Sequence, residues 1–456
     1  MTTSRFEIND KFKYLNGFNG YHQSEAAEGA IPSVINIPQK SKYGLYTERI
    51  SGSSFTAPRK DSKQTWLYRL LPSTCHEEFS LLENHPFNLN NFLNFKYQYS
   101  PNRSTWAPVQ VAQEADFLTG LQLIGGAGNP TMKEGLAYYA FTAGKSMPSN
   151  QAFYSADGDF LLAPQKGTLD IRTEMGYLRV RSNEICVIPR GIRFHVSLPA
   201  GPVRGFALEL FEGHFELPEL GPIGSTGLAN IRDFEIPTAS FDNSDVDTEI
   251  IAKFAGQVHR AVHRGSIFNV AGWSGTYYPF KYDLGMLTST SAFSFSVTKS
   301  WDLGKFNTIG SVSYDHTDPS IFTVLTAPSS TPGEAVVDVA VFGPRWLVME
   351  KSYRPPYFHR NTMSEFAFLI KGGFDVTPLP PLLEGLFLLS NTMCAHGADP
   401  ESWKQATEKE LKPEKIPPGN LGMMFESKYI IGLTETANKK FMKLTGQSGE
   451  FGKAHI

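Results

Sequence analysis

His359 is the histidine whose neighbours best suit a metal site among the 11 in this 456-residue chain. It lies in a polar segment with two prolines, residues 354–366, which also contains Glu365. Prolines stiffen the backbone and suit ligands held in a fixed geometry. Two imidazoles and one carboxylate bind iron(II) on one face in non-haem oxygenases and leave positions open for O2 and substrate. His359 and Glu365 are therefore candidate ligands. Their spacing predicts a turn between them, and zinc or manganese suits them as well as iron does.

Three other histidines have neighbours that suggest chemistry. His316 lies between Asp315 and Asp318, and such carboxylates can fix an imidazole's tautomer and raise its pKa, as in a general acid or base. The alternative is an ordinary turn, because a proline follows Asp318. His259 and His263 have the spacing of two ligands on one face of a helix. Arginines follow both and no third ligand is near in sequence, so a solvated face is the simpler interpretation.

The composition excludes several classes of protein. The chain has 42 Lys and Arg against 45 Asp and Glu, so nothing indicates a nucleic-acid or membrane partner. Three scattered cysteines are too few for a disulfide framework. The N-terminus is polar, and no apolar run is long enough to span a bilayer. We therefore expect a cytoplasmic protein.

Strand-like segments dominate the pattern. Aromatic residues make up 13% of the chain, and 40 Gly and 30 Pro separate short β-branched and aromatic runs. Such runs are typical of a β-sandwich or barrel. Leu169 and Ile171 alternate with polar residues before a turn at Gly176, and Leu178 and Val180 alternate after it. This pattern predicts a half-buried hairpin.

A cupin-like jelly roll is expected over residues 150–215. Residues 189–195 are a Pro-x-Gly turn followed by a strand with a histidine, which resembles the second half of a cupin motif. The His-x-His pair of the first half is absent from the preceding strands. We therefore predict a jelly roll without a metal, in which His195 is structural.

Helix signals are few. Residues 399–411 begin with Asp and Pro and have acidic residues early, which predicts a helix with Asp399 as its N-cap. Residues 247–264 have apolar side chains near helical spacing and predict a second helix. The Ser/Thr-rich residues 288–300 suggest a surface excursion, and a new group of strand-like runs begins after residue 305.

The predicted fold is mainly β and has two domains. Residues 1–305 form a β-rich N-terminal domain with the cupin-like jelly roll, of β-sandwich type. Residues 306–456 form a smaller β-rich C-terminal domain that contains the candidate ligands His359 and Glu365.

Several motifs resemble those of the homogentisate 1,2-dioxygenase family. Examples are Asp157-Gly-Asp-Phe-Leu-Leu-Ala-Pro-Gln-Lys-Gly167 and Arg354-Pro-Pro-Tyr-Phe-His-Arg-Asn-Thr-Met-Ser-Glu-Phe366. Further matches are residues 43–56, 66–73, 221–230 and 318–327. The likeness runs collinearly from about residue 14 to 435, and residues 16–29 look most like fungal members.

The resemblance implies a set of site residues and a reaction. His359, Glu365 and His396 would bind Fe(II), His396 would also contact substrate, and His316 would be the catalytic residue that handles a hydroxyl proton. O2 would be inserted into homogentisate, a small aromatic hydroquinone, to give maleylacetoacetate in tyrosine and phenylalanine catabolism. The resemblance also implies a homohexamer, a dimer of trimers, or a homotrimer.

The chain departs from the family between the second and third implied ligands. Phe374 stands where the family has a substrate-contacting Tyr, Thr377 replaces a Lys, and Leu388 or Leu389 replaces a His. Each change removes or weakens a hydrogen-bond partner suited to a carboxylate, and a buried carboxylate without donors is costly.

Three functions therefore stay open at this point. The first is homogentisate 1,2-dioxygenase, and the second is a divergent enzyme that cleaves a less polar para-hydroquinone. The third is a cupin-like binding protein without catalysis.

Overall fold

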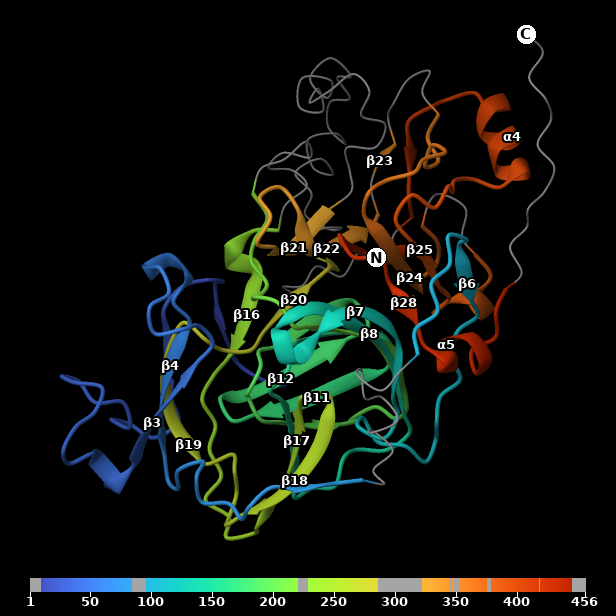
Figure 1. Cartoon of the computed structure of the whole chain (residues 1–456). Coiled ribbons are helices and arrows are strands. Elements are labelled where there is room, and N and C mark those ends of the chain that lie inside the picture. The colour runs from blue at the N-terminus through green and yellow to red at the C-terminus, as the bar shows by residue number, and fades with distance from the viewer. Residues whose placement is uncertain are drawn as a thin grey trace.

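The computed structural model describes residues 10–83, 96–219, 229–285, 322–344, 346–347, 353–374, 379–417 and 419–444. Most regular elements in these ranges are β-strands (Figure 1). The α-helices among these residues are α4 (Pro400–Glu408) and α5 (Glu435–Lys439). Short 3-10 turns occur at Lys42–Gly44, Arg59–Asp61, Pro130–Met132, Ile231–Asp233 and Pro381–Leu383. None of the described helices is long and apolar enough to cross a membrane.

Two large sheets form the N-terminal β-sandwich. The central sheet has the order β1 (Tyr14–Asn16), β16 (Phe234–Pro237), β20 (Phe280–Asp283), β13 (Glu184–Ile188), β10 (Asp159–Lys166), β15 (Val203–Leu210), β8 (Glu134–Ala143), β7 (Leu121–Asn129) and β28 (Gly432–Leu433). The outer sheet has the order β12 (Gly176–Arg181), β11 (Thr168–Thr173), β14 (Phe194–Ser197), β9 (Gln151–Ser155), β17 (Thr248–Phe254), β18 (Gln257–His263) and β5 (Ser80–Leu81).

Residues 150–215 form the predicted jelly roll. The chain passes between the sheets, because β9, β11, β12 and β14 belong to the outer sheet and β10, β13 and β15 to the central one. The predicted hairpin is β11–β12, in which Leu169 pairs with Val180 and Ile171 with Leu178. Both pairs are fully buried, so the mainly β, cupin-like sandwich is confirmed.

Two smaller sheets complete the arrangement. A side lobe, to the left in Figure 1, has the order β2 (His22–Glu25), β19 (Val270–Gly275), β4 (Gln64–Arg69) and β3 (Tyr46–Ser51). The C-terminal sheet has the order β21 (Phe322–Pro328), β22 (Ala335–Phe342), β27 (Leu421–Ser427), β24 (Ser364–Lys371), β25 (Phe387–Ser390) and β6 (Ser104–Trp106). Strands β23 (Trp346–Leu347) and β26 (Glu414–Lys415) pair separately.

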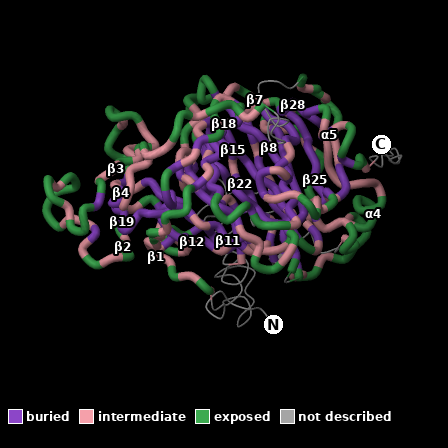
Figure 2. Tube along the Cα trace, turned by 90° about the horizontal axis from the view of Figure 1, so that it is seen from below, coloured by how far each residue is buried: buried purple, intermediate pink, exposed green. Residues whose placement is uncertain are grey.

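An aromatic layer joins the C-terminal sheet to the central sheet. Phe366 on β24 stacks on Tyr138 of β8, with ring centroids 4.6 Å apart, and Phe368 lies 4.5 Å from Phe206 of β15. These side chains belong to one buried cluster that includes both sheets, the continuous interior of Figure 2. Such packing holds one face of β24 firmly and so fixes the direction of the other face.

Each of the two main parts of the chain also contributes a strand to the sheet of the other part. β6, near residue 105, joins the C-terminal sheet, and β28, near residue 432, joins the central sheet. The predicted boundary near residue 305 and the predicted excursion at 288–300 lie outside the described residues, so the division into 1–305 and 306–456 stays a prediction.

The helix predicted at 399–411 is confirmed as α4. The Asp399 side chain accepts hydrogen bonds from the backbone N–H groups of Glu401 and Ser402, as an N-cap does. The helix predicted at 247–264 is wrong. Those residues form the antiparallel pair β17–β18, joined at Ala255 and Gly256, which both have positive φ.

The spacing of the apolar residues explains this error. Ile250, Phe254, Val258 and Val262 are each four residues apart, which fits one face of a helix and also the two-residue repeat of a strand. The β-branched residues favour strand, and the tight turn decides between the two structures.

A buried Asp–His pair gives the N-terminal part a pH dependence. His214 Nδ1 is 2.7 Å from Asp159 Oδ2, and its Nε2 is 2.6 Å from the Gly52 carbonyl. Burial alone would lower the pKa of His214, but the Asp159 carboxylate outweighs it and the pKa rises above 6.5. Burial alone would raise the pKa of Asp159, but His214 and Arg190 lower it below 3.8.

We expect His214→Gln to destabilise the protein more at pH 6 than at pH 9. A raised histidine pKa stabilises the folded state below the unfolded pKa, and this contribution disappears as pH rises through the folded pKa. The Asp159 contribution disappears only in acid, below 3.8, so it does not change over this range. Urea unfolding of both proteins at the two pH values measures the difference. A penalty that is equal at both pH values contradicts the prediction.

Candidate metal centre

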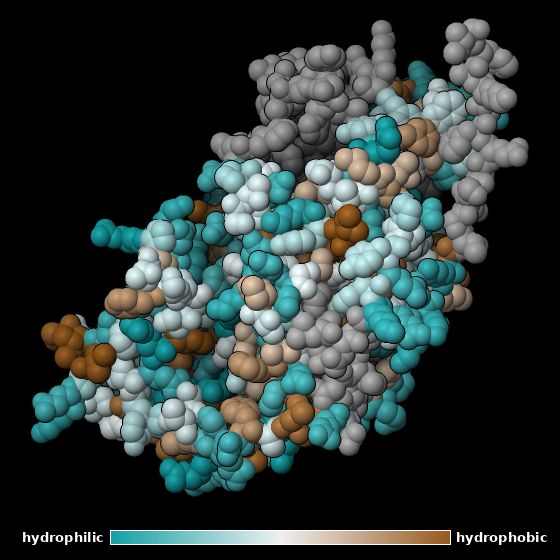
Figure 3. Space-filling model, in the orientation of Figure 1, coloured by the Kyte–Doolittle hydropathy of each residue, from teal (hydrophilic) through white to brown (hydrophobic). Residues whose placement is uncertain are grey.

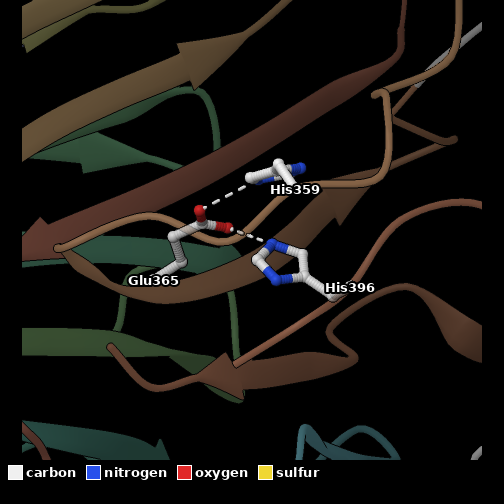
Figure 4. A group of neighbouring side chains, drawn as sticks. All are labelled: His359, Glu365 and His396. Carbon is white, nitrogen blue, oxygen red and sulfur yellow. Dashed lines mark hydrogen bonds and ion pairs between the residues drawn. The ribbon is translucent and has the colours of Figure 1, made fainter. Parts of the chain in front are cut away.

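His359, Glu365 and His396 come together at the start of β24 in the C-terminal sheet. Each offers one ligand atom, and these atoms all lie within 4.8 Å of one another (Figure 4). Glu365 is the second residue of β24, whereas the histidines lie in the segments before β24 and after β25. The predicted turn between His359 and Glu365 is present, since residues 362 and 363 form a bend.

The backbone fixes the two histidines to each other. The N–H of His359 donates to the carbonyl of His396 over 3.0 Å, and the N–H of His396 donates back over 3.1 Å. This isolated β-bridge brings the two ring centroids to 4.2 Å. The ligand positions therefore depend on main-chain pairing as well as on side-chain rotamers, which suits a preorganised site.

The ring hydrogen bonds show which nitrogens face the site. His359 Nδ1 lies 2.7 Å from the Tyr357 carbonyl, and His396 Nδ1 lies 2.8 Å from the Cys394 carbonyl. Because a carbonyl only accepts, both Nδ1 atoms carry hydrogen. A neutral ring then directs the Nε2 lone pair inward, as in metal-binding histidines.

This geometry calls for a cation between the three groups. His359 Nε2 is 3.3 Å from Glu365 Oε1, and His396 Nε2 is 2.9 Å from Oε2. Two lone pairs that face a carboxylate repel it unless a proton or a metal ion stands between them. The donor set and its convergence therefore fit a divalent metal of the type bound by two histidines and one carboxylate.

The charges around Glu365 are consistent with such a site. Burial alone would raise the pKa of Glu365, but the hydrogen bonds and charges of His396 and His359 outweigh it and the pKa is lowered. Burial alone would lower the pKa of His396, but Glu365 raises it. Glu426, opposite Glu365 in the sheet register, has its pKa raised to about 7 by burial and by the charges of Glu365 and Asp338.

Two backbone features shape the segment of the third ligand. Met393 has a φ of 58°, a left-handed conformation that is uncommon for a residue with a side chain. A Cβ atom at Gly397 would lie 2.5 Å from Phe358 Cδ1, so only glycine fits beside His396 without moving the segment that carries His359.

Part of the sheet face beside Glu365 is apolar. Ala367 of β24 is paired with Leu388 of β25 and with Met424 of β27. Paired residues share a face and alternate residues along a strand return to it, so all three lie on the face of Glu365. Leu389 points to the opposite face, into the aromatic layer. Of the two leucines considered as the replacement for a histidine, Leu388 is the one beside the metal centre.

Phe374 does not lie near the three candidate metal ligands. Its ring packs over Gly422, in the space that a Cβ atom there would need, and lies 6.2 Å from the ring of Phe342. Gly422 is four residues along β27 from Glu426, the partner of Glu365, which corresponds to about 13 Å. Within one chain, Phe374 is therefore separated from the metal ligands.

The other candidate residues have different outcomes. His316 and Thr377 lie outside the described residues. His195 is bound at both ring nitrogens, by the Gln151 carbonyl and the Ser197 hydroxyl, as a structural histidine is. His259 and His263 lie on β18, so the helical pair does not exist.

The sequence reasoning missed one contact of this centre. The Asn361 amide donates to Glu365 Oε1, and its own carbonyl oxygen accepts from the N–H of Met363. Asn361 therefore orients the carboxylate from within the turn. Its position between His359 and Glu365 in the sequence was the signal that could have identified it.

Comparison with known proteins gives consistent matches. Residues 13–284 match the family described as "Homogentisate 1,2-dioxygenase N-terminal" and residues 304–448 the corresponding C-terminal family. The chain is 47% identical over 453 residues to the homogentisate 1,2-dioxygenase of Emericella nidulans, which covers 99% of this chain and 96% of the relative. It is 44% identical to that of Dictyostelium discoideum, over 94% of each chain.

One solved structure gives a weak match. A mutant of salicylate 1,2-dioxygenase from Pseudoaminobacter salicylatoxidans aligns with a TM-score of 0.30 and 8% identity, over 66% of this chain and 72% of that one. That alignment carries no weight here. The sequence matches decide the assignment: the chain belongs to the homogentisate 1,2-dioxygenase family.

Proposed function

We propose that this chain is a ring-cleaving homogentisate 1,2-dioxygenase that uses Fe(II). The observation that carries the proposal is the convergence of His359, Glu365 and His396 in a chain of this family. The reaction inserts both atoms of O2 into homogentisate and cleaves the ring bond between the hydroxyl-bearing and acetate-bearing carbons. Its product is maleylacetoacetate, an intermediate of tyrosine and phenylalanine catabolism.

Iron(II) is the metal that this chemistry requires. Held by His359, Glu365 and His396, it would supply open positions for O2 and a phenol side by side, in place of a diffusional encounter. The protein's part is to hold the two Nε2 atoms and one carboxylate in place through the backbone bridge and Asn361. The apolar face of Ala367, Leu388 and Met424 suits an aromatic ring beside them.

His316 is proposed as the catalytic acid or base, on the strength of the family resemblance. Flanking carboxylates at Asp315 and Asp318 suit an imidazole that accepts a hydroxyl proton. Phe374 remains a candidate substrate neighbour only if it reaches a metal centre other than that of its own chain.

Oxygen uptake with homogentisate tests the proposed function. We expect the Fe(II)-loaded protein to consume one O2 per homogentisate and to form a product whose mass is that of substrate plus O2. Methylhydroquinone, which lacks the carboxylate, should be a poor substrate. Preference for methylhydroquinone would replace the proposal by the less polar substrate class. Turnover of neither compound by iron-loaded protein would leave a binding protein.

We also propose that the chain forms a homo-oligomer, a hexamer or a trimer, in the cytosol. Large apolar side chains are exposed on the side lobe and its neighbouring loops, among them Phe55 (93% exposed) and Val34 (88%). Figure 3 shows hydrophobic side chains at this end of the molecule. Clustered exposed apolar side chains are typical of surfaces that a subunit covers. Light scattering of the purified protein measures the assembly, and a monomer at micromolar concentration would contradict it.

A further inference from the structure

A basic side chain lies on the metal-bearing face of the C-terminal sheet. Glu365 pairs with Ser390 of β25, and β25 pairs with β6 in a register that joins Leu389 to Ser104. Continuing that register by one residue places Arg103 opposite Ser390. Arg103 and Glu365 are then two strand spacings apart, about 9.6 Å between their backbones.

The alternation along β6 gives the direction of the Arg103 side chain. Trp106 stacks on Phe387 in the aromatic layer, with ring centroids 4.9 Å apart. Successive strand residues point to opposite faces, so the side chain of Ser104 points to the same face as that of Trp106, and the side chain of Thr105 points to the other face. Arg103 shares the face of Thr105, which is the face of Leu388, Ser390 and Glu365.

A contact with the segment of the third ligand supports this placement. The Asn391 amide donates to the Ser100 carbonyl over 3.4 Å. The loop before β6, which carries Arg103, therefore lies against the segment that leads from β25 to His396.

Arg103 is also available to bind an anion. Its side chain is exposed, and its guanidinium forms no hydrogen bond or ion pair with any residue in the part of the chain that the structure describes. The hydroxyl of Ser390, between Arg103 and Glu365, is buried and lacks a hydrogen-bond partner among the same residues. A cation and a hydroxyl without partners thus lie beside the carboxylate ligand.

We infer that Arg103 is a specificity-determining residue that binds the carboxylate of homogentisate beside the metal centre. This inference rests on the proposed function. The acetate group is attached at one end of the bond to be cleaved, so its carboxylate must lie near the metal. A guanidinium suits a carboxylate because its N–H groups match two oxygens at once.

The inference also accounts for the altered residues of this chain. Phe374 is distant from the ligands of its own chain, and Leu388 offers no hydrogen bond. A carboxylate bound there without donors would be disfavoured. Arg103, the residue before β6, supplies the donors from the other side of Ser390.

Binding of two ligands to two proteins tests the role of Arg103. Calorimetry under nitrogen would compare homogentisate with its uncharged methyl ester on Fe(II)-loaded wild-type protein and on Arg103→Met. We expect the substitution to weaken homogentisate binding on the order of 10- to 100-fold. Binding of the ester should change by no more than about twofold. Arg103→Lys should recover part of the loss, because the charge remains.

Matched controls separate this role from a structural one. Arg232→Met removes an exposed charge of the N-terminal part, beside Asp233, and should leave both affinities unchanged. The iron content and Tm of each variant report the integrity of the site. If Arg103→Met weakens the binding of homogentisate and of its ester equally, or weakens neither, the inference is overturned and the proposed function stands. A wild-type protein that does not bind homogentisate overturns both.

Discussion

Glu365→Gln should abolish most of the iron binding and lower homogentisate turnover by more than about 100-fold, since losing a residue that merely supports a ligand already costs 10- to 100-fold. The substitution removes the negative charge toward which both Nε2 atoms are directed, at 3.3 and 2.9 Å. A neutral amide is a poor ligand for a divalent ion and cannot compensate its charge. The rest of β24 should be unaffected, because its opposite face packs in the aromatic layer.

Iron analysis after anaerobic loading, followed by oxygen uptake, measures both effects. Glu408→Gln, on the exposed helix α4 of the same half of the chain, is the control for loss of one carboxylate. It should retain iron and turnover. Wild-type rates in Glu365→Gln would show that Glu365 is not a ligand.

Lys253→Met should produce the largest loss of stability, about 3–5 kcal/mol. The Lys253 side chain is fully buried in the β-sandwich, 2.5 Å from Asp157 and 3.0 Å from Glu209. Burial alone would lower the pKa of Lys253, but Glu209 and Asp157 raise it, so the ammonium stays charged. Its removal leaves two buried carboxylates without a counter-charge, which is far more costly than the loss of a surface pair.

Urea unfolding of Lys253→Met and of Lys166→Met compares the loss of stability at a buried lysine with that at an exposed lysine. Lys166 lies at the exposed end of β10, in the same sandwich, and its replacement should change stability by less than about 0.5 kcal/mol. Replacing all three groups by neutral ones, Asp157→Asn, Glu209→Gln and Lys253→Met, should recover part of the loss. Equal stability of the two single variants would mean that the buried ion pairs contribute little.

The parts of the fold that local patterns encode were predictable from the sequence. The hairpin β11–β12 has a two-residue repeat and a glycine turn, and α4 has an N-cap and a proline at its start. The helix predicted over β17–β18 failed because a four-residue spacing satisfies both periods. The positive φ at Ala255, which closes the tight turn, has no clear signal in the sequence.

The candidate site was predictable only to the extent that its residues are close in sequence. His359 and Glu365 lie in one motif, and Asn361 between them could have been included. His396 was assigned through family resemblance, because the bridge that pairs it with His359 depends on the tertiary fold. Arg103 has no local signal at all. It reaches the site because β6 joins a sheet formed by residues far along the chain.

Titration of the metal-free protein with Fe(II), followed by homogentisate-dependent oxygen uptake, tests the central claim most directly. We predict that activity rises in proportion to iron and reaches its plateau at one iron per chain, the capacity of a single His359–Glu365–His396 group. Oxygen uptake that is already complete in metal-free protein, or that stays absent after one iron is bound, would contradict the assignment of this group as the iron centre of a homogentisate dioxygenase.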